Sequence, residues 1–156
     1  PPFPAKYARA AAEIAAKRGW KLRYIAMNVR QDLPLCRTLV SETGGEAAAA
    51  PEDTAALARL FASARLTVSM RLHALTLSYL AGTPAFGIDG DGRIAAFAKE
   101  CGIPYRTVEE CGDIAAALEE ALTAETPDAA IWNDRIAAGR AALARALRAP
   151  EKEKEK

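Results

Sequence analysis

The chain has 156 residues, a net charge of +1 and a composition that is 51% hydrophobic but only 6% aromatic. This length fits one domain, which can bury roughly 70% of the surface that its unfolded chain exposes. The near-neutral charge gives no electrostatic basis for nucleic-acid binding, which needs a basic face or stripe. No apolar run approaches the roughly 20 residues of a membrane span.

The cysteines indicate a cytoplasmic protein. Cys36, Cys101 and Cys111 are odd in number and form no Cys-x-x-Cys pair, so reduced thiols fit better than a disulfide framework. With only one histidine beside them, they provide no usual set of metal ligands. We therefore expect neither a metal ion nor a bound cofactor.

Helices and short apolar strands alternate along the chain. Three times a helical stretch ends at a glycine and a strand follows: 5–18 before 22–28, 72–81 before 84–88, and 94–101 before 105–108. A glycine just past a helix supplies the left-handed residue that closes its last turn. A further strand is expected at 66–69, and helical periodicity appears around Leu57, Leu60 and Phe61 and again around Ile114, Leu118 and Ala121.

This alternation predicts parallel strands joined by helical crossovers. The fold class is therefore α/β: a three-layer, Rossmann-like domain with a short parallel sheet and flanking helices. A last helix is expected at 128–148, with a cap at Thr126 and a proline in its first turn. Residues 44–50 are expected to form a loop of small residues. The domain spans 1–148, and we treat 149–156 as a disordered or engineered charged tail.

The segment 67–75 carries the strongest functional signal, because an apolar strand runs straight into a helix there. Ligands of parallel sheets bind at the carboxyl ends of strands, and a helix N-terminus attracts anions. We expect Ser69 to cap the helix. Arg71 and His73 fall in its first turn, where cations are unfavourable for the helix itself, so the pattern indicates a bound anion. Arginine grips carboxylate or phosphate, and histidine can exchange a proton near neutral pH.

Each of these side chains also has a simpler interpretation. Arg71 either binds an anion or pairs with a carboxylate such as Asp32 or Asp91. His73 either exchanges protons or is an ordinary surface or core histidine. Asp32, in the loop 28–32 after a strand, either lines the cleft or caps the next helix. Asp89 and Asp91 either face a substrate or stabilise an Asp-Gly turn.

The sequence Arg71-Leu72-His73-Ala74-Leu75, the Ala-Gly-Thr-Pro step that follows it and the loop 87–94 resemble the polysaccharide pyruvyl transferase family. Members commonly read Ser-x-Arg-Leu-His-Ala-Leu, then a Gly-Val-Pro strand entry and a Tyr-Asp-Pro-Lys-Val loop. The resemblance covers roughly residues 3–122. This chain departs from the pattern at Gly90, where an aromatic is usual, at Gly92, where proline is usual, and at Arg93, where lysine is usual.

The resemblance implies one lobe of a two-lobed transferase similar to GT-B glycosyltransferases. Such enzymes move the enolpyruvyl unit of phosphoenolpyruvate onto two sugar hydroxyls as a cyclic ketal and release phosphate. Carried over, Arg71 binds the carboxylate or phosphate of the donor. His73 is then the general acid that protonates either the methylene carbon or the leaving phosphate. Ser69, Asp32, Asp91 and Arg93 are further candidates for substrate binding.

By this resemblance, the chain is the C-terminal, donor-side lobe. Family members enter this lobe through a strand that should end near Pro1–Pro4, so we expect that strand and the N-terminal lobe to be missing. The exposed strand edge favours a homodimer, and the fragment alone should be inactive.

The expected partners are phosphoenolpyruvate and a sugar or lipid-linked saccharide, met in the cytoplasm or at the inner face of the membrane. The alternatives are the nucleotide-sugar lobe of a GT-B glycosyltransferase and a non-catalytic α/β binding module.

Overall fold

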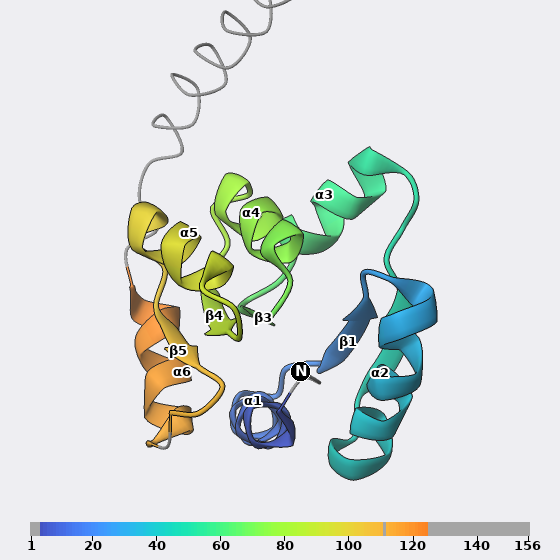
Figure 1. The fold of residues 1–156 in the computed structure, drawn as a ribbon. Coiled ribbons are helices and arrows are strands. Elements are labelled where there is room, and N and C mark those ends of the chain that lie inside the picture. The colour runs from blue at the N-terminus through green and yellow to red at the C-terminus, as the bar shows by residue number, and fades with distance from the viewer. Residues whose placement is uncertain (1–3, 111, 125–156) are drawn as a thin grey trace, which may run out of the picture.

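The computed structural model describes residues 4–110 and 112–124. Helices and short strands alternate throughout this part of the chain (Figure 1). The elements are α1 Ala5–Arg18, β1 Arg23–Ala26, α2 Val29–Thr43, β2 Glu46–Ala49, α3 Thr54–Ala62, β3 Thr67–Ser69, α4 Leu72–Leu80, β4 Ala85–Asp89, α5 Arg93–Cys101, β5 Tyr105–Thr107 and α6 Ile114–Thr123. Cys111, the helix expected at 128–148 and the tail 149–156 lie outside the described residues.

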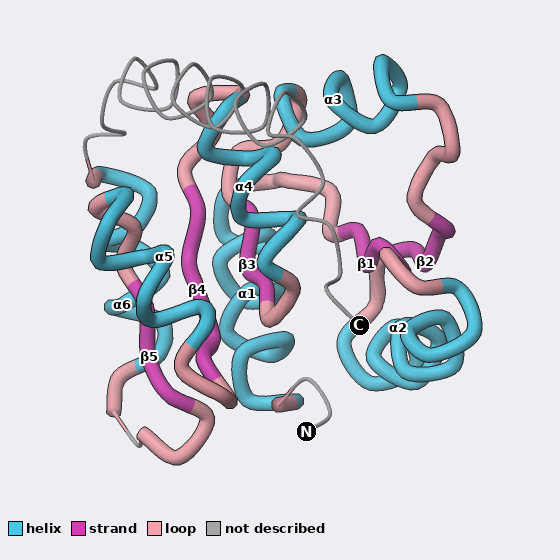
Figure 2. Tube along the Cα trace, turned by 45° about the horizontal axis from the view of Figure 1, so that its top comes forward, coloured by secondary structure: helices cyan, strands magenta, loops and turns pink. Residues whose placement is uncertain are grey.

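The strands form two separate parallel sheets. β1 pairs with β2, and Ile25 lies opposite Ala48. β3, β4 and β5 form the second sheet in that order, with Ser69 opposite Gly87 and Gly87 opposite Tyr105. Figure 2 shows β3, β4 and β5 in one row and β1 and β2 set apart from them. The predicted parallel pairing is confirmed, but it is divided between two sheets.

Helices cover both faces of the larger sheet, so the predicted three-layer arrangement is confirmed. On one face, Phe86 and Ile88 of β4 pack with buried residues of α1 and α6, such as Tyr7 and Leu118. On the other face, Ala85 packs with residues of α4 and α5, such as Leu75. Every residue of β4 is buried, as expected for a central strand of a parallel sheet.

Gly87 in the middle of β4 is required by a close contact with α5. A Cβ atom at this position would lie 2.7 Å from Cγ2 of Ile94 and 3.2 Å from Cβ of Tyr105. Real Cβ atoms do not approach other carbons as closely as the first distance. The missing side chain therefore lets α5 lie directly on the strand that precedes it.

Two segments that we predicted as loops are regular structure. The expected loop 44–50 contains β2, which follows two glycines with positive φ, Gly44 and Gly45. A Cβ atom at Gly45 would lie 2.6 Å from the carbonyl oxygen of Leu22, so the strand can enter the sheet only past a glycine. The run of alanines in β2 has low strand propensity, which is why the sequence did not reveal it.

The expected loop 28–32 is the start of α2. Asn28 is its N-cap, and its Oδ1 accepts a hydrogen bond from the backbone N–H of Gln31 at 3.3 Å. In return, the N–H of Asn28 donates to Oδ2 of Asp32 at 2.8 Å. This reciprocal cap satisfies N–H groups that the first turn leaves without helical partners. The helix then continues through Pro34, which removes one helical hydrogen bond. Because proline usually ends or kinks a helix, the sequence pattern did not indicate a helix here.

Candidate active site

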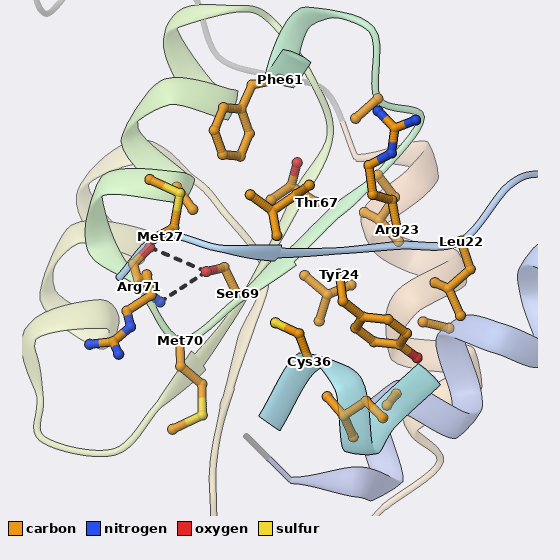
Figure 3. Close-up of a pocket in the computed structure, with 18 of the residues that line it drawn as sticks. Leu22, Arg23, Tyr24, Met27, Cys36, Phe61, Thr67, Ser69, Met70 and Arg71 are labelled. Carbon is orange, nitrogen blue, oxygen red and sulfur yellow. Dashed lines mark hydrogen bonds between the residues drawn. The ribbon is translucent and has the colours of Figure 1, made fainter. Parts of the chain in front are cut away.

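A cavity of about 990 Å³ lies between the two sheets and reaches the carboxyl ends of their strands. We call this end of the cavity its mouth. The deeper walls of the cavity are largely apolar. The polar residues at its mouth come from the start of α2, the end of β3 and the β4–α5 loop: Gln31, Asp32, Ser69, Arg71, Asp91 and Arg93. The cavity is thus lined by five of the six site residues predicted from the sequence, all except His73. Figure 3 shows several of its lining side chains.

Ser69 holds the turn between β3 and α4. Its side chain is buried, and its Oγ accepts a hydrogen bond from the N–H of Arg71 at 2.9 Å and donates one to the carbonyl of Arg71 at 3.3 Å (Figure 3). α4 begins only at Leu72, with Arg71 in extended backbone conformation as its N-cap. The prediction that Ser69 caps the helix is therefore wrong, because its hydroxyl is already engaged one step before the helix. No side chain among the described residues caps α4.

Arg71 forms an ion pair with Asp32 across the mouth of the cavity. Nη2 of Arg71 donates to Oδ1 of Asp32 and, at 3.4 Å, to Oε1 of Gln31. Asp32 is 17% exposed at its side chain, whereas Arg71 is 47% exposed. Of the two carboxylates that the sequence offered Arg71, the structure pairs it with Asp32. Asp32 serves both roles that we left open, because it completes the cap of α2 and also lines the cavity.

His73 is exposed and lies at the second position of α4, outside the cavity lining. Residues two apart on a helix face different directions. Ala74, the next residue, is buried and lines the cavity. The imidazole is therefore at the same helix start as Arg71 but faces solvent beside the cavity mouth rather than its interior.

The β4–α5 loop is organised by its two aspartates. Asp89 is buried, and its carboxylate accepts hydrogen bonds from the N–H groups of Gly92, Ile94 and Ala95, at 2.9, 3.0 and 3.2 Å. Asp91 pairs with the guanidinium of Arg93, whose Nε and Nη2 lie 2.9 and 2.6 Å from Oδ2. Both aspartates therefore stabilise the turn, which was one of the two interpretations that the sequence allowed.

Charge and burial change the pKa values of three side chains that line the cavity. The hydrogen bonds from Arg93 lower the pKa of the Asp91 carboxyl. Burial raises the pKa of the Cys36 thiol, and the nearby carboxylate of Asp32 raises it further. Burial also raises the pKa of Tyr24, whose hydroxyl is hydrogen-bonded to Thr43 at 2.5 Å. The arrangement is suited to holding an anion at the mouth of the cavity, beside Arg71 and Arg93. Three further cationic side chains line the cavity elsewhere: Lys21, Arg23 and Arg65.

Comparison with known families agrees with this geometry. The family model for polysaccharide pyruvyl transferase matches residues 1–92, which include β3, α4, β4 and the β4–α5 loop. The chain belongs to the polysaccharide pyruvyl transferase family. Searches of curated proteins and of solved structures gave no significant match.

Membership in the pyruvyl transferase family indicates a transferase of polysaccharide biosynthesis, with a donor and a sugar acceptor as its substrates. The matched range contains every site residue predicted from the sequence except Arg93, which follows it directly. The residue that the sequence reasoning missed is Gln31, which contacts Arg71. It stands beside Asp32 in the segment that we had predicted as a loop. Had this segment been recognised as the first turn of α2, Gln31 would have been a candidate together with Asp32.

Two further findings concern the part of this pyruvyl transferase that the structure describes. Within residues 4–110 and 112–124, no helix has the length and apolarity needed to cross a membrane. In the same ranges, no three His, Cys, Asp or Glu side chains gather as a group that could hold a metal ion. Cys36 and Cys101 are both buried.

Proposed function

We propose that the chain is the donor-binding lobe of a polysaccharide pyruvyl transferase that uses phosphoenolpyruvate. The observation that carries this proposal is the position of Arg71: a half-exposed guanidinium at the uncapped start of α4, over the mouth of a large cavity. Among the described contacts, only Nη2 of Arg71 is engaged by Asp32 and Gln31. Nε and Nη1 therefore remain available for a carboxylate or phosphate.

In the proposed reaction, two sugar hydroxyl oxygens become bonded to C2 of phosphoenolpyruvate. The bond between C2 and the phosphate oxygen breaks, and phosphate leaves. The two hydroxyl groups lose two protons in all. C3 gains one proton, which turns the methylene into a methyl group, and the leaving phosphate takes the other. The product is a cyclic ketal that keeps the donor carboxylate.

Arg71 and His73 divide the work in this proposal. Arg71 binds the carboxylate or phosphate, and the helix N-terminus adds favourable charge. His73 is the general acid, which protonates either C3 or the leaving phosphate. Because His73 faces solvent beside the cavity, the reacting carbon must lie at the mouth rather than in the apolar depth. Such a position is open to an acceptor sugar held by another part of the enzyme.

Binding measurements can separate this proposal from a nucleotide-sugar lobe. The intact protein would be titrated with phosphoenolpyruvate and with UDP-glucose by isothermal calorimetry. We expect binding of phosphoenolpyruvate that is weakened in Arg71→Ala and unchanged in Arg59→Ala, an exposed arginine on α3. Preference for UDP-glucose would refute the proposal. Binding of neither ligand would favour a non-catalytic module and would equally count against it.

A further inference from the structure

β5 is the last strand of the larger sheet. The strands of this sheet follow the order β3, β4, β5, so among the described strands β5 pairs only with β4 (Figure 2). The carbonyl of Pro104 and the N–H of Val108 form hydrogen bonds with β4. Because backbone groups alternate in direction along a strand, those of Tyr105 and Thr107 point to the open side. An open edge of this kind is a template on which another strand can pair.

The backbone groups on this open side are bonded to nearby residues of the same chain. The carbonyl of Tyr105 accepts a hydrogen bond from Nη1 of Arg106 at 3.1 Å. The N–H of Thr107 donates to Oε2 of Glu110 at 3.2 Å, and the carbonyl of Thr107 accepts from the N–H of Glu110 at 3.3 Å. On the open side of β5, only the N–H of Tyr105 lacks such a bond among the described contacts. The edge therefore offers little to an added strand.

Arg106 and Glu110 also contact each other, and we call these two residues the edge pair. Nε of Arg106 lies 3.7 Å from Oε2 of Glu110, the oxygen that also accepts the hydrogen bond from Thr107. Both side chains are about half exposed, at 48% and 51%. An exposed ion pair contributes little to the free energy of unfolding, so fold stability alone does not account for the edge pair. Its contacts with the open backbone groups indicate a role at the edge itself.

The charge of Arg106 opposes pairing with a second copy of the chain as well. Identical strands that pair across a two-fold axis run antiparallel. One register satisfies both outward residues, with Tyr105 of each copy opposite Thr107 of the other, so that the two exchange hydrogen bonds. Arg106 of one copy then lies directly opposite Arg106 of the other, in the kind of pair where side chains are closest. Like charges in this position destabilise a strand pair.

We propose that the edge pair prevents β5 from pairing with a second copy of this chain. Arg106 acts in two ways, because it occupies the carbonyl of Tyr105 and places a positive charge opposite its own copy. Glu110 occupies both the N–H and the carbonyl of Thr107. Without the edge pair, two copies join their larger sheets into one continuous sheet through antiparallel β5 strands. The inference depends on strand pairing alone and is independent of the proposed function.

The test is the double variant Arg106→Ala, Glu110→Ala, which removes the edge pair and leaves the net charge of the chain unchanged. By light scattering, we expect this variant to become dimeric as its concentration rises, whereas the parent chain stays monomeric. Hydrogen exchange at the amides of Tyr105 and Thr107 should be slower by at least about tenfold in the dimer than in the same variant after dilution to monomer. In the parent, exchange at these amides should not depend on concentration.

Two further variants distinguish strand pairing from other kinds of association. The matched control is Arg9→Ala, Glu42→Ala, which removes an exposed ion pair between α1 and α2 and should stay monomeric. Adding Thr107→Pro to the double variant should restore the monomer, because proline has no N–H to donate on the open side. The N–H of Thr107 points away from β4, so this proline leaves the hydrogen bonds between β4 and β5 in place. Circular dichroism would check that each variant is folded.

Several results would overturn the inference. A double variant that is folded and monomeric at every concentration would show that β5 needs no such protection. Dimers of the control variant would mean that the loss of any surface ion pair is sufficient. A dimer of the double variant with unchanged exchange at Tyr105 and Thr107, or one that persists with Thr107→Pro, would place the contact on another surface. The exchange measurement alone locates the contact if the proline variant does not fold. A parent chain that already dimerises with both amides protected would show that the edge pair does not close the edge.

Discussion

Arg71 and Asp32 stand 39 residues apart in the sequence and meet as an ion pair that joins the two sheets at their carboxyl ends. Asp32 holds Arg71 with one carboxylate oxygen and the backbone N–H of Asn28 with the other. The position of the guanidinium is therefore tied to the cap of α2. An anion that binds Arg71 must do so beside a carboxylate that is already in contact with it.

Replacing Asp32 with asparagine is expected to strengthen phosphoenolpyruvate binding. The change removes a negative charge next to the proposed anion site, and a Coulomb energy of about 1 kcal/mol at 4 Å in water corresponds to about fivefold in affinity. Asparagine can still accept the hydrogen bond from the N–H of Asn28. The matched control is Glu46→Gln, which removes a carboxylate paired with Arg23 where β1 and β2 begin. Weaker binding in Asp32→Asn would show that Asp32 positions Arg71 more than it repels the donor.

Replacing Arg71 with lysine is expected to weaken donor binding by at least about tenfold. Lysine keeps the charge but cannot make the two parallel hydrogen bonds of a guanidinium, and bonds to charged groups contribute about 1.5–3 kcal/mol each. Titration calorimetry with phosphoenolpyruvate would measure the change. Arg59→Lys, on the exposed side of α3, is the control. Equal affinities of Arg71→Lys and the parent would remove this contact from the proposal.

Replacing His73 with alanine is expected to lower turnover of the complete enzyme by at least about 100-fold, the usual contribution of a general acid. His73→Gln should be as slow, because glutamine can donate a hydrogen bond but cannot release a proton. Phosphate release from phosphoenolpyruvate in the presence of an acceptor saccharide would report the rate. Near-normal turnover of the alanine variant would exclude His73 from the chemistry. Rescue by glutamine would reduce its role to hydrogen bonding.

Local signals in the sequence were sufficient to predict most of the helices and four of the strands that the structure describes. Glycines such as Gly19 and Gly102 end helices in the left-handed conformation, and these ends were predictable. β2 was not predicted because its alanines have little strand preference. Its position also depends on the close approach of Gly45 to Leu22, which no local pattern indicates. The division into two sheets is a relation between distant strands, so no local pattern could reveal it.

The site was predictable as a set of residues but not as a set of contacts. The strand-to-helix junction at 69–73 indicated Ser69, Arg71 and His73. Nothing in the sequence could decide whether Arg71 pairs with Asp32 or Asp91, because both follow strands at the same edge. The structure decides through Arg93, which engages Asp91 within its own loop. The sequence placed the start of α4 correctly at Leu72, but the direction of His73 away from the cavity depends on how the helix packs against the sheet, which no local pattern reveals.

The Asp91 carboxyl is expected to titrate below the usual range of aspartate, because Arg93 donates hydrogen bonds to it. Since the pKa in the folded state is lowered, the pair stabilises the fold above the ordinary pKa of aspartate. That contribution is lost as the pH falls through the lowered value. Both side chains are well exposed, so the effect should be small and should shrink with added salt. An NMR titration of Arg93→Ala should return the Asp91 pKa toward its ordinary value, and an unchanged pKa would contradict the assignment.

Replacing Gly87 with alanine is expected to destabilise the fold by about 1–3 kcal/mol, the usual cost of overpacking. The new Cβ would overlap Cγ2 of Ile94 at 2.7 Å, so α5 would have to move away from β4. Gly112→Ala is the control, since a Cβ there meets no atom within 4 Å. The double variant Gly87→Ala, Ile94→Ala should lose less stability in urea than the sum of the two single changes, because the second removes the atom that clashes. Additive losses would mean that the cost at Gly87 has another origin. α5 is preceded by the loop that holds Asp91 and begins with Arg93. Gly87→Ala, which displaces this helix, should therefore weaken donor binding as well as stability, whereas Gly112→Ala should change neither.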